Sequence, residues 1–243
     1  MSMPGTLIGV GVGPGDPELI TLKAVRVLQV ADAIAYFAKA GNQSHARDVV
    51  AAHLQSSVRE LPLLYPITTE VAKDTEEYRK AIESFFERST ASIAKELDAG
   101  HMVAVICEGD PMFYSSYMHI HVRLAERYRT EVIAGVTGMS GCWSSVGVPI
   151  AQGDDVLTVL PATLSEAELE RRVADANAAV VMKMGRHLPK VRRALERAGR
   201  LSRAIYIERG TMNGAKAMPL AEKNDDVAPY FSIVLVPGWE ARS

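Results

Sequence analysis

The 243-residue sequence has little cysteine, no excess of either charge and no long apolar run, and each shortage excludes a class of protein. Its two cysteines, Cys107 and Cys142, lie far apart, which excludes a thiolate zinc cluster and gives no disulfide framework. With 27 basic against 29 acidic residues, the net charge of -2 does not favour nucleic acid or an anionic membrane. The longest apolar runs, such as MVAVIC and FSIVLV, are too short to cross a bilayer. No basic segment followed by an apolar stretch occurs near the N-terminus, so we expect no signal peptide and a cytoplasmic location.

The motifs of nucleotide-binding loops are also missing, although the chain has an early glycine-rich segment, GVGVGPGDP at residues 9–17. A dinucleotide fold requires glycine at i, i+2 and i+5, and the third glycine is absent here in every register. The next expected strand ends in Tyr36 and Phe37, where an acid that binds ribose would stand, and no GxxxxGK[ST] motif occurs. These departures exclude a nucleotide diphosphate. The alternative that the glycines only form a tight turn stays open.

Short apolar runs alternate with amphipathic segments along the whole chain. The pattern predicts strands at Thr6–Val12, Asp32–Phe37, Met102–Cys107, Glu131–Gly135, Asp155–Pro161, Ala178–Met184, Ala204–Gly210 and Tyr230–Val236. It predicts helices at Asp74–Ala99, Ser165–Asn177 and Leu188–Gly199, and a further helix capped by Thr21 with Leu22, Val25, Leu28 and Ala31 on one face. Asp16, followed by Pro17, is the cap of an earlier turn. This alternation indicates an α/β protein with mostly parallel sheets, with room for antiparallel strands late in the chain.

One stretch, GVPIAQGDD at residues 147–155, has the composition of a linker. We therefore expect two α/β lobes, an N-terminal lobe at 1–148 that carries the glycine loop and a C-terminal lobe at 149–243.

Loops of small residues follow four of the later strands. They are EGDPMFYSS at 108–116, AGVTGMSG at 134–141, KMGRH at 183–187 and ERGTMNG at 208–214. In open parallel sheets ligands bind at the carboxyl ends of strands, so these loops are expected to line one crevice. Small residues there let backbone amides and carbonyls approach a ligand directly, which suits an adenosyl group better than a diphosphate. Met182 and the valines before it are expected in the core, and Met184 outside it at the strand end.

Several of these motifs together resemble one family. GVGPGDPELITLKAVRVLQ, EGDPMFYSS, VTGMSG and VVMKMG, in this order, are similar to the tetrapyrrole (corrin/porphyrin) methyltransferases, which use S-adenosylmethionine. The stretches GNQSHAR, YPITTE, CEGDPMFYSSYMHIHVRL, GDDVLTVLPAT, KMGRHLPKVRRAL and APYFSIVLVPG are most similar to family members of cobalamin synthesis. The resemblance implies a class III methyltransferase-like homodimer with S-adenosylmethionine folded between two lobes. It also implies methylation of precorrin-2 at carbon 20.

The resemblance also implies where the ligands bind. Cofactor-binding positions carry over to Pro14, Gly109, Asp110, Pro111, Tyr114, Thr137, Gly138, Met184 and Gly210. Two positions depart from the family pattern: Ala134 stands where proline is usual, and Phe37 stands where relatives acting on uroporphyrinogen have an aspartate. The proton-accepting role proposed for that aspartate therefore does not transfer, which disfavours uroporphyrinogen as substrate.

Methyl transfer to a ring carbon needs alignment and then removal of a proton by a base. Glu108, Tyr114 and Tyr117 are the catalytic candidates, because with Asp110 they flank the second loop. The carboxylates around a tetrapyrrole rim suit basic side chains, and we expect His45, Arg47 and Arg186 to bind them, the alternative being solvated surface charge.

Other chemistries find less support. His119 and His121 are two apart on an expected helix and point away from each other, so we expect no metal site. The basic run KVRRALERAGR at 190–200 lacks an aromatic platform and is expected to form a solvated face rather than bind RNA. No GxSxG motif surrounds the serines at 140–145, which disfavours a hydrolase. The alternatives that stay open are a cobalt-containing ring, another corrin carbon, methylation of RNA or protein, and a non-catalytic tetrapyrrole carrier.

Overall fold

The computed structural model describes residues 4–67 and 75–238, and the chain divides into two compact units, residues 1–137 and 138–243. Both units are α/β, which confirms the expected fold class. The expected boundary after Val148 lies beyond this division. The reason is that Met139, Cys142 and Trp143 of α5 (Gly138–Ser145) pack against the sheet of the second unit, so this helix belongs to it.

A parallel five-stranded sheet forms the centre of the first unit. Its strands are β1 (Thr6–Gly11), β2 (Ala33–Lys39), β3 (Arg59–Tyr65), β4 (Met102–Cys107) and β5 (Arg129–Ile133), in the order β3-β2-β4-β1-β5. Every neighbouring pair is parallel, so the carboxyl ends of all five strands lie at one edge of the sheet. The sequence did not predict β3, and β5 begins and ends two residues before its predicted bounds.

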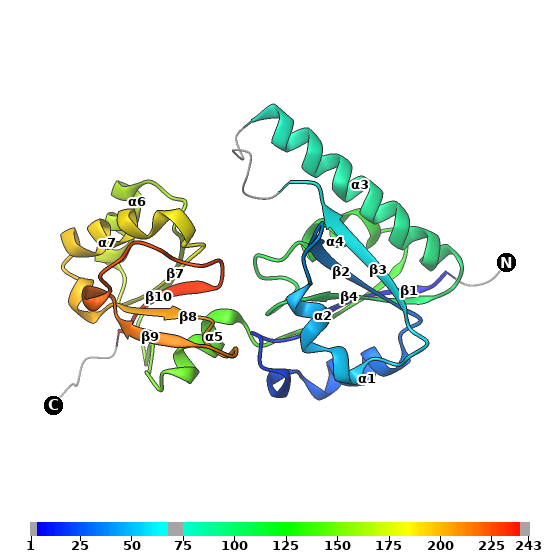
Figure 1. The fold of residues 1–243 in the computed structure, drawn as a ribbon, viewed down its shortest axis with the longest axis horizontal. Coiled ribbons are helices and arrows are strands. Elements are labelled where there is room, and N and C mark those ends of the chain that lie inside the picture. Colours follow the sequence, from blue (N-terminus) through cyan, green and yellow to red (C-terminus); the bar gives the residue numbers. More distant parts are fainter. Residues whose placement is uncertain (1–3, 68–74, 239–243) are drawn as a thin grey trace. The chain divides into compact units, whose positions relative to one another are not determined.

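Helices cover both faces of this sheet (Figure 1). On one face lie α1 (Leu22–Val30) and α2 (His45–Val49), and on the other α3 (Glu76–Asp98) and α4 (Tyr117–Leu124). Strand residues alternate between the two cores, as Leu7 and Ile8 illustrate. The predicted start of α3 at Asp74 lies outside the described residues, as does the end of the YPITTE stretch.

Most of the predicted details of the first turns are confirmed. The Asp16 side chain accepts a hydrogen bond from the Glu18 N–H, and Thr21 caps α1 by accepting from the Ala24 N–H at 3.1 Å. The predicted apolar face of α1 is partly wrong, because Leu22 is 74% exposed while Ala24 is buried. Leu22 is the first residue of the helix.

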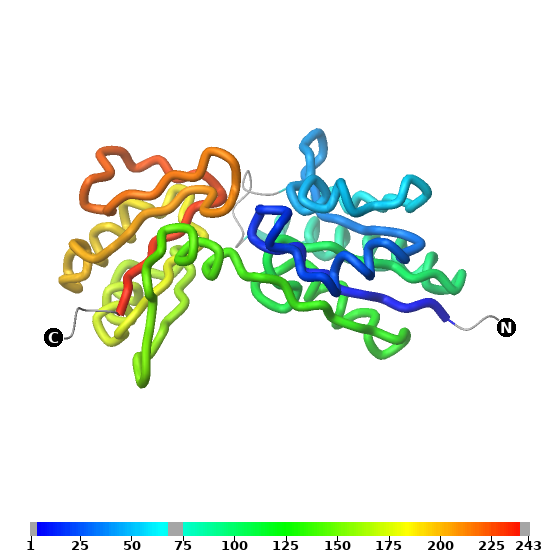
Figure 2. Tube along the Cα trace, turned by 90° about the horizontal axis from the view of Figure 1, so that it is seen from below, coloured from blue at the N-terminus to red at the C-terminus, as the bar shows by residue number. Residues whose placement is uncertain are grey.

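The second unit has a mixed sheet. It contains β6 (Leu157–Pro161), β7 (Ala178–Met182), β8 (Ile205–Glu208), β9 (Lys216–Pro219) and β10 (Ser232–Val236), in the order β6-β7-β10-β8-β9. Only β6 and β7 pair in parallel, and β10, red in Figure 2, runs antiparallel between β7 and β8. As a result β6, β7 and β8 point the same way and their carboxyl ends share one edge.

The helices of this unit again lie on both faces of the sheet. α6 (Glu166–Asp175) and α7 (Leu188–Arg197) cover one face, and α5 (Gly138–Ser145) covers the other. The basic side chains of α7 are engaged within the protein: Arg193 pairs with Glu166, and Arg192 donates to the Leu220 and Lys223 carbonyls. In the part of the chain that the structure describes, no helix has the length and apolar character needed to span a membrane.

Candidate functional site

The loops after β1, β4 and β5 are joined by glycine main chain. A Cβ atom on Gly11 would lie 2.6 Å from the Gly109 carbonyl oxygen, and one on Gly135 would lie 2.0 Å from the same oxygen. Gly13 and Gly109 also form an isolated β-bridge, in which the Gly109 N–H donates to the Gly13 carbonyl at 2.7 Å. These three loops therefore pack backbone against backbone, and side chains at Gly11 and Gly135 would separate them. The glycine-rich segment does more than form a tight turn.

Asp110 stabilises the same assembly. Its carboxylate accepts hydrogen bonds from the Met112 N–H at 2.8 Å and from the Gly135 N–H at 3.1 Å. Both carboxylate oxygens are thus used to join the second loop to the third. Pro111 beside it is buried, and Pro14 and Thr137 are half-buried. Six of the predicted cofactor-binding residues therefore lie in loops at one edge of the sheet: Pro14, Gly109, Asp110, Pro111, Tyr114 and Thr137.

Glu108 brings a catalytic candidate next to a substrate-binding candidate. It directly follows β4, and its carboxylate accepts a hydrogen bond from the Ala46 N–H at the beginning of α2, close to His45. Burial raises the pKa of Glu108, while His45 and the Ala46 N–H act in the opposite direction. Because the residue keeps exposed surface, the raised pKa reflects packed surroundings rather than complete removal from water. An exposed carboxylate can accept a proton, so Glu108 can act as a base.

Tyr114 in the loop after β4 and Tyr117, the first residue of α4, differ in exposure. Tyr114 is 45% exposed and its ring contacts Phe113 edge to face, so it can meet a ligand. Tyr117 is fully buried, its ring lies where a Cβ on Gly9 would be, and its hydroxyl is 3.1 Å from His121 Nδ1. This position does not support the expected catalytic role of Tyr117, because the buried side chain has no surface that a substrate could contact.

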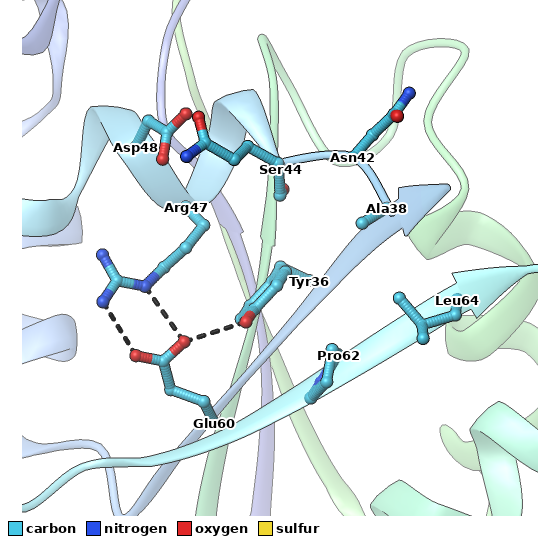
Figure 3. A pocket seen from close by; sticks show the side chains of 10 residues that line it. Tyr36, Ala38, Asn42, Ser44, Arg47, Asp48, Glu60, Pro62 and Leu64 are labelled. Atoms are coloured by element: carbon cyan, nitrogen blue, oxygen red, sulfur yellow. Dashed lines mark hydrogen bonds and ion pairs between the residues drawn. The ribbon is translucent and has the colours of Figure 1, made fainter. Parts of the chain in front are cut away.

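Arg47 already binds a carboxylate within the protein. Its Nη2 and Nε atoms donate to Glu60 at 2.8 and 3.0 Å, and the Tyr36 hydroxyl donates to the same carboxylate at 2.9 Å (Figure 3). These bonds lower the pKa of Glu60, the Arg47 bond most of all. The three side chains line a hollow of about 290 Å³ between α2 and the ends of β2 and β3. A substrate carboxylate would have to displace Glu60 to bind Arg47.

The predicted residues of the second unit are placed in different surroundings. Met184 is fully buried among the residues under α7, so the expectation that it stands outside the core is wrong, and only its main chain remains for a ligand. Gly210 packs on α5, where a Cβ would lie 2.5 Å from Cys142 Sγ. Gly138 and Arg186 are exposed, and a Cβ on Gly138 would have no neighbour within 4 Å.

The loops after β4, β7 and β8 each contain a residue with a strained backbone conformation. In residues 4–67 and 75–238, the residues other than glycine with positive φ are Tyr114 at 54°, Lys183 at 60° and Arg209 at 51°. Each follows a strand end, after β4, β7 and β8 respectively. A left-handed conformation costs a non-glycine residue about 1–2 kcal/mol. Such strain is often found at functional sites. Sequence reasoning did not identify Lys183 and Arg209, because only glycine or asparagine signals this conformation in a sequence.

The remaining candidates have structural partners. His119 stacks on Phe86 with ring centroids 4.3 Å apart, and burial lowers its pKa. His121 lies on the other side of the helix beside Tyr117. Phe37 packs in the core between the sheet and α3.

Comparison with known proteins identifies the family. The profile described as Tetrapyrrole (Corrin/Porphyrin) Methylases matches residues 6–223. The precorrin-2 C(20)-methyltransferase of Sinorhizobium sp is 60% identical over 238 residues, which cover 98% of this chain and 97% of that protein. The solved structure of the cobalt precorrin-4 methyltransferase CbiF superposes with a TM-score of 0.73 at 20% identity, covering 96% of this chain and 94% of the other. The solved structure of the uroporphyrin-III C-methyl transferase from Thermus thermophilus complexed with S-adenyl homocysteine superposes with a TM-score of 0.66 at 23% identity, covering 95% of this chain and 97% of the other. These two structures share the fold, and with the profile and the full-length relative they show that the chain belongs to the tetrapyrrole (corrin/porphyrin) methylases.

Proposed function

We propose that this protein transfers the methyl group of S-adenosylmethionine to carbon 20 of precorrin-2. The observation that carries the proposal is the 60% identity, over almost the whole of both chains, to a precorrin-2 C(20)-methyltransferase. The geometry agrees with this function, since the loop after β4, at the carboxyl edge of the first sheet, exposes the apolar side chains of Met112 and Tyr114.

The loops of the first unit fit an adenosyl donor. Close glycine packing holds the three loops together, and Asp110 bonds the second loop to the third. Pro14, Gly109, Pro111, Tyr114 and Thr137 would contact the donor there. In the second unit Gly138, Gly210 and the main chain of Met184 are further contacts by the family resemblance. The donor supplies an electrophilic methyl group on a sulfonium, so the protein has mainly to align it with the ring carbon.

We assign to Glu108 the removal of the proton that the ring carbon loses. Its carboxylate is fixed by the Ala46 N–H, its pKa is raised, and it keeps contact with solvent. His45 beside it and Arg186 in the second unit are our candidates for the ring carboxylates. Arg47 fills this role only if Glu60 gives way, so we assign it first to holding α2 against β3.

The test is transfer of labelled methyl from S-adenosylmethionine to purified rings, followed by mass analysis of the product. We expect one methyl on precorrin-2, at carbon 20. Methylation only of the cobalt-containing ring, or at a different carbon, would contradict the substrate. Label in total RNA or protein but not in the ring would contradict the class of substrate. Ring binding without measurable affinity for S-adenosylhomocysteine would indicate a carrier.

The proposal includes a homodimer in the cytoplasm. The dimer rests on the family resemblance, and light scattering of the purified protein tests it. The two free cysteines, Cys107 and Cys142, are compatible with a reducing compartment.

A further inference from the structure

Two cationic residues directly follow strands that share an edge of the second sheet. Lys183 follows β7, Arg209 follows β8, and both are exposed. Both also have the left-handed backbone that favours glycine, with φ of 60° and 51°. Tyr114 of the first unit is the third such residue in the described part of the chain, and it lies in a loop assigned to ligand binding.

The register of the sheet places these residues near each other. Val234 of β10 is opposite both Val181 of β7 and Tyr206 of β8, so the three residues form one row across the sheet. Lys183 lies two residues beyond this row and Arg209 three residues beyond it, in the same direction. One strand separates them, so their main chains are about 10 Å apart. Lysine and arginine side chains are long enough to span this separation.

The left-handed backbone indicates that these side chains have a use. Glycine would adopt φ of 51–60° without strain, so a strained lysine and a strained arginine need another reason. Neither side chain is buried, so burial of apolar area does not supply that reason. The Arg209 guanidinium lies over its own loop, because a Cβ on Gly214 would be 3.9 Å from its Nη1 atom. Exposed Arg186 adds a third cation at the same edge.

We propose that Lys183 and Arg209 together bind carboxylate groups of the ligand at this edge. The inference rests on the proposed function and adds to it the residues that recognise the anionic part of the substrates. Two ligands could supply the carboxylate: the acidic arms of the tetrapyrrole rim, or the amino-acid end of the methyl donor. Both form charge-assisted bonds with ammonium and guanidinium groups.

The experiment uses substitutions that separate charge from backbone strain. Lys183→Asn with Arg209→Asn removes both charges and keeps a residue that tolerates the left-handed region. Lys183→Gly with Arg209→Gly removes the charges and the strain. Arg209→Lys keeps a charge, and Arg171→Gln on α6, where Arg171 pairs with Glu168, is the matched control for loss of an arginine. The readouts are KM and kcat for the ring, the dissociation constant of S-adenosylhomocysteine by calorimetry, and the melting temperature.

We expect both double variants to bind one of the two ligands about tenfold more weakly than the parent does. A higher KM for the ring, with kcat within threefold, identifies the tetrapyrrole arms, and weaker binding of S-adenosylhomocysteine identifies the donor. The melting temperature of the glycine pair should be no lower than that of the parent. Arg209→Lys should reduce ligand binding less than the double variants do. Arg171→Gln should change the binding of neither ligand. Unchanged KM and unchanged S-adenosylhomocysteine binding would overturn the inference, as would a lower melting temperature of the glycine pair. If the unmodified enzyme transfers no methyl to any ring, the proposed function fails, while the calorimetric comparison still tests the carboxylate site.

Discussion

Gly135→Ala would place a methyl group where main chain already lies. The added Cβ would be 2.0 Å from the Gly109 carbonyl oxygen and 2.8 Å from Gly11 Cα, whereas non-bonded heavy atoms prefer about 3.5 Å. The third loop would have to move by more than about 1 Å from the second, which would also break the bond from the Gly135 N–H to Asp110. Overpacking costs about 1–3 kcal/mol, and the upper end applies because both neighbours are backbone atoms that cannot rotate away. We therefore expect a loss of about 3 kcal/mol, which lowers the melting temperature by roughly 10 °C.

The assay is urea and thermal unfolding followed by circular dichroism, together with calorimetric titration of S-adenosylhomocysteine. Gly138→Ala is the matched control for stability, because the same methyl group there meets nothing within 4 Å and Gly138 has no positive φ. We expect Gly138→Ala to change the free energy of unfolding by less than about 0.5 kcal/mol. If Gly135→Ala were as stable as this control, the close packing of the three loops would not be a requirement of the fold.

Three further predictions concern the polar side chains of the first unit. Glu60→Gln should cost about 1 kcal/mol at pH 7, since its half-exposed ion pair with Arg47 is partly screened. Because the pKa of Glu60 is lowered in the folded protein, this stability is present above the unfolded pKa of about 4.3 and is lost as pH falls through the lowered folded pKa; unfolding measured from pH 7 into this acid range should show the difference between variant and parent disappear. Tyr117→Phe should lose about 1 kcal/mol with its bond to His121 and keep kcat within about twofold, and a hundredfold loss of activity would restore Tyr117 as a catalytic candidate. Glu108→Gln should lower kcat by about 100-fold and leave the affinity for S-adenosylhomocysteine unchanged. The rate of the parent should increase with pH, with a midpoint above the ordinary carboxyl pKa, and the variant should lack this increase. A pH profile shared by variant and parent would count against Glu108 as the base.

The strands that the sequence did not predict are both edge strands. β3 and β9 lie at the outer edges of their sheets, and β3 contains Pro62, which lacks the N–H that a central strand uses. Most residues of both strands are exposed or half-exposed, so neither leaves an apolar run in the sequence. Central strands such as β4 and β10 are buried on both faces, and their runs MVAVIC and FSIVLV were sufficient to predict them.

The loops of the site were predictable from the sequence, whereas the direction of single side chains was not. Small residues after strands marked all the loops described above. Tyr117 and Met184 stand within three residues of exposed loop positions and yet point into the core, because α4 and the turn before α7 have already begun there. The cationic residues Lys183 and Arg209 were missed for the opposite reason, since their unusual feature is the backbone angle and not the residue type.

The glycines of these loops can be divided by what a side chain would meet. At Gly11 and Gly135 a Cβ would meet main chain, so the fold itself requires glycine. At Gly185 the requirement is a φ of +42°, which strains other residues. Gly138 meets neither condition: the space beside it is open and its backbone does not need glycine. If the methyl donor approaches the main chain there, Gly138→Ala should weaken the binding of S-adenosylhomocysteine and leave the stability of the protein unchanged. Gly135→Ala, in contrast, should lower the stability. Equal affinity in the variant and the parent would mean that the donor does not approach Gly138, and that the resemblance misplaces this contact.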